Sequence, residues 1–93
     1  MASEFTAADV LGWSKKSQDW YFQTSITMAS FIATQNPGDH AKCIEDWYFE
    51  GGQVDHRRND QIRSDLQRFP DYHPTAIILA RIEKVCGSLV FAK

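Results

Sequence analysis

The feature that most constrains the fold is a run of fifteen residues without a charged side chain, residues 20–34 (WYFQTSITMASFIAT), in a chain in which 24% of residues are charged. A helix that is apolar or small around most of its circumference is usually buried against several neighbours. We therefore predict a buried central helix over residues 17–34, with Ser17 as its N-cap. At helical spacing, one side of this helix carries Trp20, Met28 and Phe31, and another carries Phe22, Ile26, Ala29 and Ala33.

A membrane span is the rival interpretation of this run. The run is shorter than the roughly 20 apolar residues that a bilayer core requires. Six of its fifteen residues are Gln, Thr or Ser. We therefore expect no membrane insertion.

Length and charge limit the class of protein further. A chain of 93 residues is expected to form one domain over residues 1–93, with residues 1–4 disordered or derived from a tag. Ten basic and twelve acidic side chains give a formal net charge of −2. Nucleic-acid binding and attachment to an anionic membrane both favour a strongly basic surface, so we expect neither partner.

Caps and breakers predict a helix on each side of the central one. Thr6 with Asp9 three residues later is nearly a capping box, and it begins a short helix that ends at Gly12. The polar residues 14–16 are predicted to form a turn, and residues 35–38 (QNPG) break the central helix.

The next helix is predicted over residues 40–49, capped by Asp39 and stopped by Gly51-Gly52. Ile44, Trp47 and Tyr48 form its inner face at i, i+3 and i+4.

Two more helices complete an all-α prediction. The first follows a polar loop and is capped by Asp55, with Ile62, Leu66 and Phe69 facing inward and a mixed-charge face in solvent. The second runs over residues 75–89, after Pro74, with His73 as its N-cap. Its apolar stripe is Ile78, Ile82, Val85, Cys86 and Leu89. No strand alternation of useful length is present, so we predict a compact bundle of four to five helices around the central apolar helix.

Two cysteines, Cys43 and Cys86, permit one disulfide, and two free buried thiols are the alternative. Each lies on or next to the apolar stripe of a different predicted helix, so the two sulfurs meet if these helices pack together. A bridge closes a loop of 44 residues, which the chain-entropy model values at about 4 kcal/mol. We hypothesise that this bridge forms, in an oxidising compartment.

No constellation of residues indicates catalysis. His40 and Cys43 have helical i, i+3 spacing and Cys86 offers a third ligand, but a structural zinc site requires four ligands in paired short spacings. A cysteine nucleophile requires a thiolate, a histidine and an exposed pocket, whereas both cysteines lie among apolar residues. The three histidines could form a pH switch, but His73 is explained as a cap and His56 as a residue of a charged loop. We expect a non-enzymatic protein without cofactor or metal.

An interaction surface is the remaining candidate site. A helix cannot turn three consecutive aromatic residues inward, so at least one of Trp47, Tyr48 and Phe49 is expected near the surface, beside the polar loop that follows. Aromatic and arginine side chains together are typical of binding hot spots. We assign partner binding to Trp47, Phe49, Glu50, Gln53, Asp55, His56, Arg57 and Arg58.

The order of short motifs carries a family resemblance over residues 6–86. An opening TAADVL is followed by Trp20-Tyr21 and a small-residue helix, then by AKCI, by Phe69-Pro70 and by HPTAII before Cys86. This order resembles the small disulfide-stapled periplasmic helical proteins grouped around the Tai-type immunity proteins of bacterial type VI secretion. It is more distantly similar to the acid-stress chaperone HdeA. The chain departs from typical members in having residues 23–25 (QTS) in place of a Gly-rich turn, and only two cysteines.

The resemblance implies a periplasmic helical fold, a Cys43–Cys86 bridge, a homodimer and no catalysis. It implies a protein that binds another protein, such as a toxic effector enzyme that it neutralises by inserting residues 50–58 into the active site. The alternative is an acid-stress chaperone of the HdeA kind. The first residues (MASE) have no basic start followed by an apolar segment, which leaves open a cytosolic protein or a mature exported one whose leader has been removed.

Overall fold

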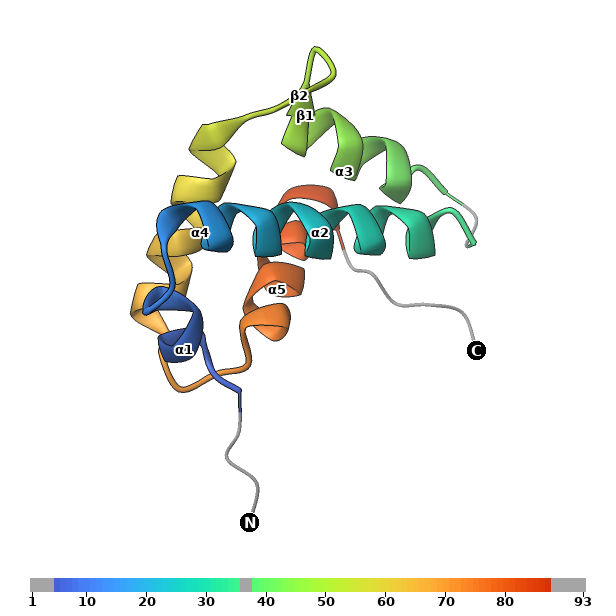
Figure 1. Cartoon of the computed structure of the whole chain (residues 1–93). Helices are drawn as coiled ribbons and strands as arrows, with labels where there is room; N and C mark the ends of the chain where they lie inside the picture. Colours follow the sequence, from blue (N-terminus) through green and yellow to red (C-terminus); the bar gives the residue numbers. More distant parts are fainter. Residues whose placement is uncertain (1–4, 36–37, 88–93) are drawn as a thin grey trace.

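The computed structural model describes residues 5–35 and 38–87 of the chain. Within these residues the chain forms a small all-α domain with one disulfide and a two-stranded hairpin, as Figure 1 shows. The elements, in chain order, are α1 (Ala7–Leu11), α2 (Lys15–Ala33), α3 (His40–Tyr48), β1 (Phe49–Glu50), β2 (Gln53–Val54), α4 (His56–Arg68) and α5 (Pro74–Cys86). The predicted fold class is confirmed. No helix in this part of the chain is both long and apolar enough to cross a bilayer.

The hydrophobic core is built on one face of α2, which packs against α3, α4 and α5. The residues that α2 contributes to the core are Phe22, Ile26, Ala29 and Ala33. The other elements contribute Ala7, Val10, Ile44, Trp47, Tyr48, Ile62, Leu66, Ile77, Ile78 and Ile82. The predicted burial of α2 around most of its circumference is wrong, because Trp20, Met28 and Phe31 are exposed on the side away from this core.

The N-terminus of α2 lies earlier than predicted. The helix begins at Lys15, and the hydroxyl of Ser14 accepts a hydrogen bond from the backbone N–H of Ser17 at 3.2 Å. Ser14 is therefore the N-cap and Ser17 lies in the first turn, so of the predicted turn at residues 14–16 only Ser14 lies outside the helix. Lysine is a good helix former, which explains why Lys15 and Lys16 extend the helix.

The region after α3 departs from the prediction of a longer helix stopped by glycines. The helix ends at Tyr48, and the chain turns back through a hairpin in which Phe49 pairs with Val54. Gly51 and Gly52 have φ of 64° and 84°, a conformation that glycine adopts without strain and that a two-residue hairpin turn requires. Phe49 therefore lies in a strand, and the premise of three consecutive aromatics on one helix is wrong.

The caps of the last two helices are confirmed, and two predicted core positions are not. The Asp55 carboxylate accepts a hydrogen bond from the backbone N–H of Arg57 at 3.0 Å, and His73 Nδ1 accepts one from the backbone N–H of Thr75 at 3.1 Å. Phe69 and Val85 are exposed. Phe69 follows the last residue of α4 as its C-cap, where the helical spacing no longer fixes its direction. Leu89 lies outside the described residues.

Three partly buried side chains of α4 and α5 correct the prediction of a wholly solvated charged face. Arg63 donates to the Gln18 side-chain oxygen at 2.7 Å and to Asp19 at 2.6 Å. Arg81 and Asp65 form a bidentate salt bridge, in which Arg81 donates two hydrogen bonds of 2.8 Å to the carboxylate. These arginines join α4 to α2 and to α5, and their removal would leave partly buried carboxylates without partners.

The disulfide between Cys43 and Cys86 is present, so the hypothesised bridge is confirmed. It joins α3 to the last turn of α5, with the two Cα atoms 5.8 Å apart. Neither sulfur exists as a free thiol. A disulfide is compatible with a location outside the reducing cytoplasm.

Replacing both cysteines by serine is expected to lower the free energy of unfolding by about 4 kcal/mol, because the unfolded chain regains the freedom of a 44-residue loop. Urea denaturation of the double variant measures this, and reduction of the wild-type protein serves as the control that leaves both cysteine side chains in place. An unchanged unfolding midpoint in both experiments would contradict a stabilising role for the bridge.

Candidate functional site

The hairpin and the residues around it contain all eight predicted partner-binding residues, which the structure divides into two groups. Four side chains are exposed to solvent: Glu50, Gln53, His56 and Arg57. The hairpin that carries the first two projects from the end of α3 (Figure 1). A Cβ atom added to Gly51 or Gly52 at its tip would meet nothing within 4 Å beyond the adjoining residues of the chain. These four side chains are accessible to a partner.

The other predicted binding residues stabilise the fold. Trp47 is only 7% exposed, and the guanidinium of Arg58 lies 5.7 Å from its ring centroid. Arg58 also donates to the backbone carbonyl of Trp47 at 3.0 Å. Phe49 is half-buried and packs edge-on against the buried ring of Tyr48, at 5.0 Å between centroids. We expect their replacement to destabilise the protein before it affects binding.

Asp55 holds the hairpin against the start of α4. Its side chain is 7% exposed, caps α4, and accepts two hydrogen bonds from the Arg57 side chain, at 2.9 and 3.1 Å. Arg57 in turn reaches Glu50 at 3.4 Å. The hydrogen bonds from the Arg57 side chain are the main reason that the pKa of Asp55 lies below its ordinary value of 3.8. A carboxylate that is fixed in this way limits the motion of the hairpin base.

A second surface, which the sequence analysis assigned to the core, lies on the outside of α2. We call it the α2 outer face, and its exposed residues are Trp20, Thr24, Thr27, Met28, Phe31 and Ile32. The exposed fractions are 69% for Trp20, 57% for Met28 and 66% for Phe31. The face extends over about 17 Å from residue 20 to residue 31, at 1.5 Å per residue. It contains no charged side chain.

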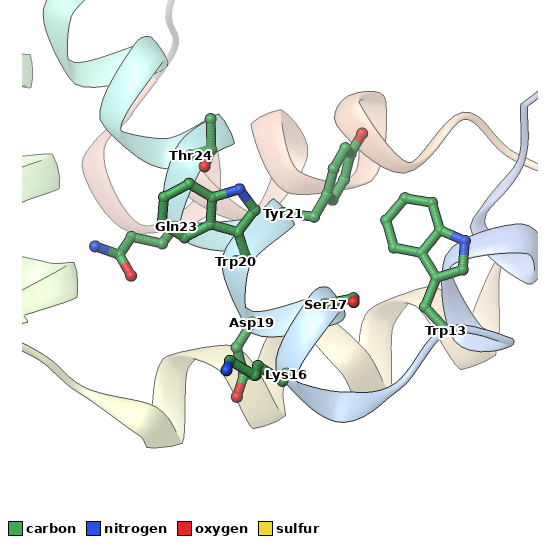
Figure 2. Close-up of a pocket in the computed structure, with 8 residues that line it drawn as sticks. All are labelled: Trp13, Lys16, Ser17, Asp19, Trp20, Tyr21, Gln23 and Thr24. Carbon is green, nitrogen blue, oxygen red and sulfur yellow. The ribbon is translucent and has the colours of Figure 1, made fainter.

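A hollow of about 810 Å³ lies beside Trp20, at the N-terminal end of the α2 outer face. Its lining consists of Trp13, Lys16, Ser17, Asp19, Trp20, Tyr21, Gln23 and Thr24. Figure 2 shows the rings of Trp13 and Tyr21 close together, with the ring of Trp20 apart from them. The centroids of the first two rings are 5.7 Å apart, and Phe5 contacts both. The hollow therefore has aromatic walls and a rim of five polar residues, of which Lys16 and Asp19 are charged and of opposite sign.

Hydrogen bonds to α1 and to α5 fix the residues at this aromatic end of α2. The amide nitrogen of the buried Gln18 donates to the backbone carbonyls of Val10, Leu11 and Trp13, at 3.1, 3.2 and 3.1 Å. The Tyr21 hydroxyl is hydrogen-bonded to that of Thr75 at 2.8 Å. The position of the aromatic walls is thus fixed by α1 and α5, so a partner would find the hollow already formed.

The candidate chemical sites weighed from the sequence do not assemble into a catalytic group. Both cysteines are in the disulfide, so neither supplies a thiolate to a metal or a substrate. In the described part of the chain, no three His, Cys, Asp or Glu side chains lie close enough together to hold a metal ion. Burial raises the pKa of the Tyr48 hydroxyl, which is bonded to Asn59 in the core. Tyr48 therefore serves as a structural hydrogen-bond donor.

The stability of the protein is expected to decrease in acid partly through Asp55. Its pKa is lower in the folded chain than in the unfolded one, so its contribution is fully present above about pH 4 and is lost as the pH falls through the folded-state value. Asp55→Asn keeps an N-cap residue but removes the charge. Urea denaturation between pH 2 and pH 6 should show a smaller loss of stability in this variant than in the wild type.

The matched control for that measurement is Asp71→Asn, which neutralises an exposed aspartate that is distant from the hairpin in sequence. It should follow the wild-type pH dependence closely. Equal pH dependence in Asp55→Asn and the wild type would show that the Asp55–Arg57 interaction does not stabilise the fold.

Comparison of the chain with protein-family models, with curated proteins and with solved structures finds no match. The similarity to the Tai-type immunity proteins and to HdeA therefore stays a hypothesis that depends on short motifs. What the molecule does has to be inferred from the chemistry of its surface.

Proposed function

We propose that this chain is a non-enzymatic protein-binding protein of the periplasm, and that it binds a partner protein through the α2 outer face. The observation that supports this is the exposure of three large apolar side chains, Trp20, Met28 and Phe31, along one uncharged helix face. Burying apolar surface is favourable by about 25 cal/mol per Å². Apolar patches of this kind on small proteins are frequently interaction sites.

The composition of the α2 outer face fits a protein partner. Tryptophan, phenylalanine and methionine are enriched in the cores of protein interfaces, and charged residues are depleted there. The partner surface should likewise be uncharged and apolar, since burying an unpaired charge is unfavourable. Complementarity of this type makes affinity depend little on salt concentration, in contrast to binding through charged patches.

The hollow beside Trp20 is the proposed centre of the interface. Aromatic walls from Trp13, Trp20 and Tyr21 suit an apolar or aromatic side chain of the partner. Such anchors in preformed pockets contribute most of the binding energy in many complexes. Because Gln18 and Thr75 hold the walls in place, little conformational entropy is lost on binding.

Inhibition of a secreted effector is the proposed biological role, as the resemblance to the immunity proteins implies. In this proposal the exposed hairpin residues Glu50 and Gln53, with His56 and Arg57 at the start of α4, contact the effector separately from the α2 outer face. The hairpin suits insertion into a cleft, because it projects from α3 (Figure 1) and its base is fixed by Asp55. The disulfide suits the oxidising compartment in which such effectors act.

An acid-stress chaperone is the second candidate, and the same exposed apolar residues favour it. A chaperone of this kind would bind unfolded clients at pH 2–3 and suppress their aggregation. A binder of one folded partner would do neither. Aggregation assays at that pH, with a client protein that unfolds in acid, separate the two candidates.

The binding proposal predicts that Trp20→Ser with Phe31→Ser lowers the affinity for the partner by at least about 2 kcal/mol, as expected for hot-spot residues. Both residues are mostly exposed, so the unfolding midpoint should change little. The matched control is Leu79→Ser with Val85→Ser, which removes two exposed apolar side chains from α5. Immobilised wild type and both variants are compared by capture from periplasmic extracts, followed by titration of the captured protein.

A partner that binds the wild type and the α5 control but not the α2 variant supports the proposal. A partner that binds all three equally would overturn the assignment to α2. Sedimentation of the purified chain completes the test. A dimer that the α2 substitutions dissociate would mean that this face is covered by a second copy rather than by a different protein.

A further inference from the structure

A groove between α4 and α5 forms a second concave surface, separate from α2. Its volume is about 540 Å³, within the range of about 300 to 1,000 Å³ that is typical of small-molecule sites. Its lining consists of Asp65, Arg68, Phe69, Tyr72, Ala76, Ile77, Ala80, Arg81 and Lys84. None of these residues belongs to the hairpin or to the α2 outer face.

The floor of the groove is apolar. Ala76, Ile77 and Ala80 lie one turn apart or less on α5, and the two alanines leave room above the helix. Phe69 and Tyr72 close one end, with ring centroids 5.6 Å apart in an edge-to-face arrangement. Both rings are exposed, so they offer apolar surface to a ligand rather than to the core. From Ala76 to Lys84 the groove extends along about 12 Å of helix.

The charges that line the groove have a net positive sum. The acidic residue, Asp65, has both carboxylate oxygens bonded to Arg81 at 2.8 Å, and this pairing raises the pKa of Arg81. The guanidinium of Arg68 lies 5.5 Å from the Phe69 ring centroid. Over residues 5–35 and 38–87, neither Arg68 nor Lys84 has an acidic side chain within ion-pair distance. Two unpaired cations therefore face this groove in a chain of net charge −2.

We propose that the α4–α5 groove binds a small amphipathic carboxylate, an organic acid with an alkyl or aryl chain. The chain lies on the alanine floor and reaches the Phe69–Tyr72 end. The carboxylate accepts hydrogen bonds from Lys84, about two turns along α5 from Ala76. Arg68, beside the Phe69 ring at the other end, adds to the positive charge of the groove. Charge-assisted hydrogen bonds of this kind are roughly twice as strong as neutral ones. This inference does not depend on the proposed function of the α2 outer face.

The test is a titration of the purified chain with decanoate, below the concentration at which it forms micelles, followed by amide chemical shifts. Saturable shifts are expected at residues 76–84, and decanol, the neutral analogue, should bind at least about tenfold more weakly because it lacks the charge-assisted hydrogen bond. Lys84→Gln should weaken decanoate binding by about the same factor. Ala80→Leu fills the floor with a residue that favours helix, and it should abolish binding while the unfolding midpoint stays unchanged.

The matched control is Lys15→Gln, which changes the net charge equally at an exposed lysine of α2 and should leave decanoate binding unchanged. The proposal is overturned by equal binding of decanol and decanoate, or by equal effects of Lys84→Gln and Lys15→Gln. Shifts confined to the hollow beside Trp20 would also overturn it, since they would place the ligand on α2. Binding to anionic vesicles without binding to dispersed decanoate would identify a membrane surface instead.

Discussion

The inner face of α2 is the surface on which the other helices assemble. Phe22 and Ile26 fill the space between the helices, while Ala29 and Ala33 allow close approach to their neighbours. A chain of this length buries only about 60 to 65 per cent of the surface that its unfolded form exposes. The disulfide compensates for this small core by joining α3 to the end of α5. Two strongly constraining contacts, one apolar and one covalent, thus fix the positions of the long helices.

The polar contacts between helices add a different constraint, namely orientation. The Gln18 amide nitrogen donates to the backbone carbonyl of Val10 in α1, and its side-chain oxygen accepts a hydrogen bond from Arg63 of α4. Arg63 also pairs with Asp19, one residue further along α2. These groups are largely shielded from solvent, so loss of one partner would leave another unsatisfied. Hydrophobic contacts are not directional, whereas this network is satisfied in the orientation that buries Phe22 and exposes Trp20.

The sequence was sufficient for the fold class and for the local signals, because these depend on neighbouring residues. Thr6 with Asp9, Asp55, and His73 with Pro74 each act within one helical turn. The disulfide was a hypothesis from two cysteines on or beside apolar stripes, which only the packing of α3 against α5 could decide. The interhelical ion pairs were not predictable, since Arg63 and Asp19 are 44 residues apart. Nor does hydropathy distinguish an apolar side chain that packs in the core from one that faces solvent, which explains the error over Trp20 and Phe31. The helical spacing, which places Phe22 and Ile26 on one side of α2 and Trp20 and Phe31 on another, did contain the information needed to separate buried from exposed residues.

That division of α2 into two sides has a consequence for function. The core needs only the Phe22 side. Serine or lysine in place of the large apolar side chains opposite would serve folding equally well, with a lower risk of aggregation. Thr24 and Thr27 among them make this face partly polar without adding charge. An outer face with exposed aromatic residues and no charge is expected where a neutral surface docks, whereas the α4–α5 groove, with Arg68 and Lys84 unpaired among the residues described, is suited to an anion. The molecule therefore presents an uncharged apolar surface on α2 and a cationic groove between α4 and α5. The two share no residues, so occupation of one leaves the residues of the other free.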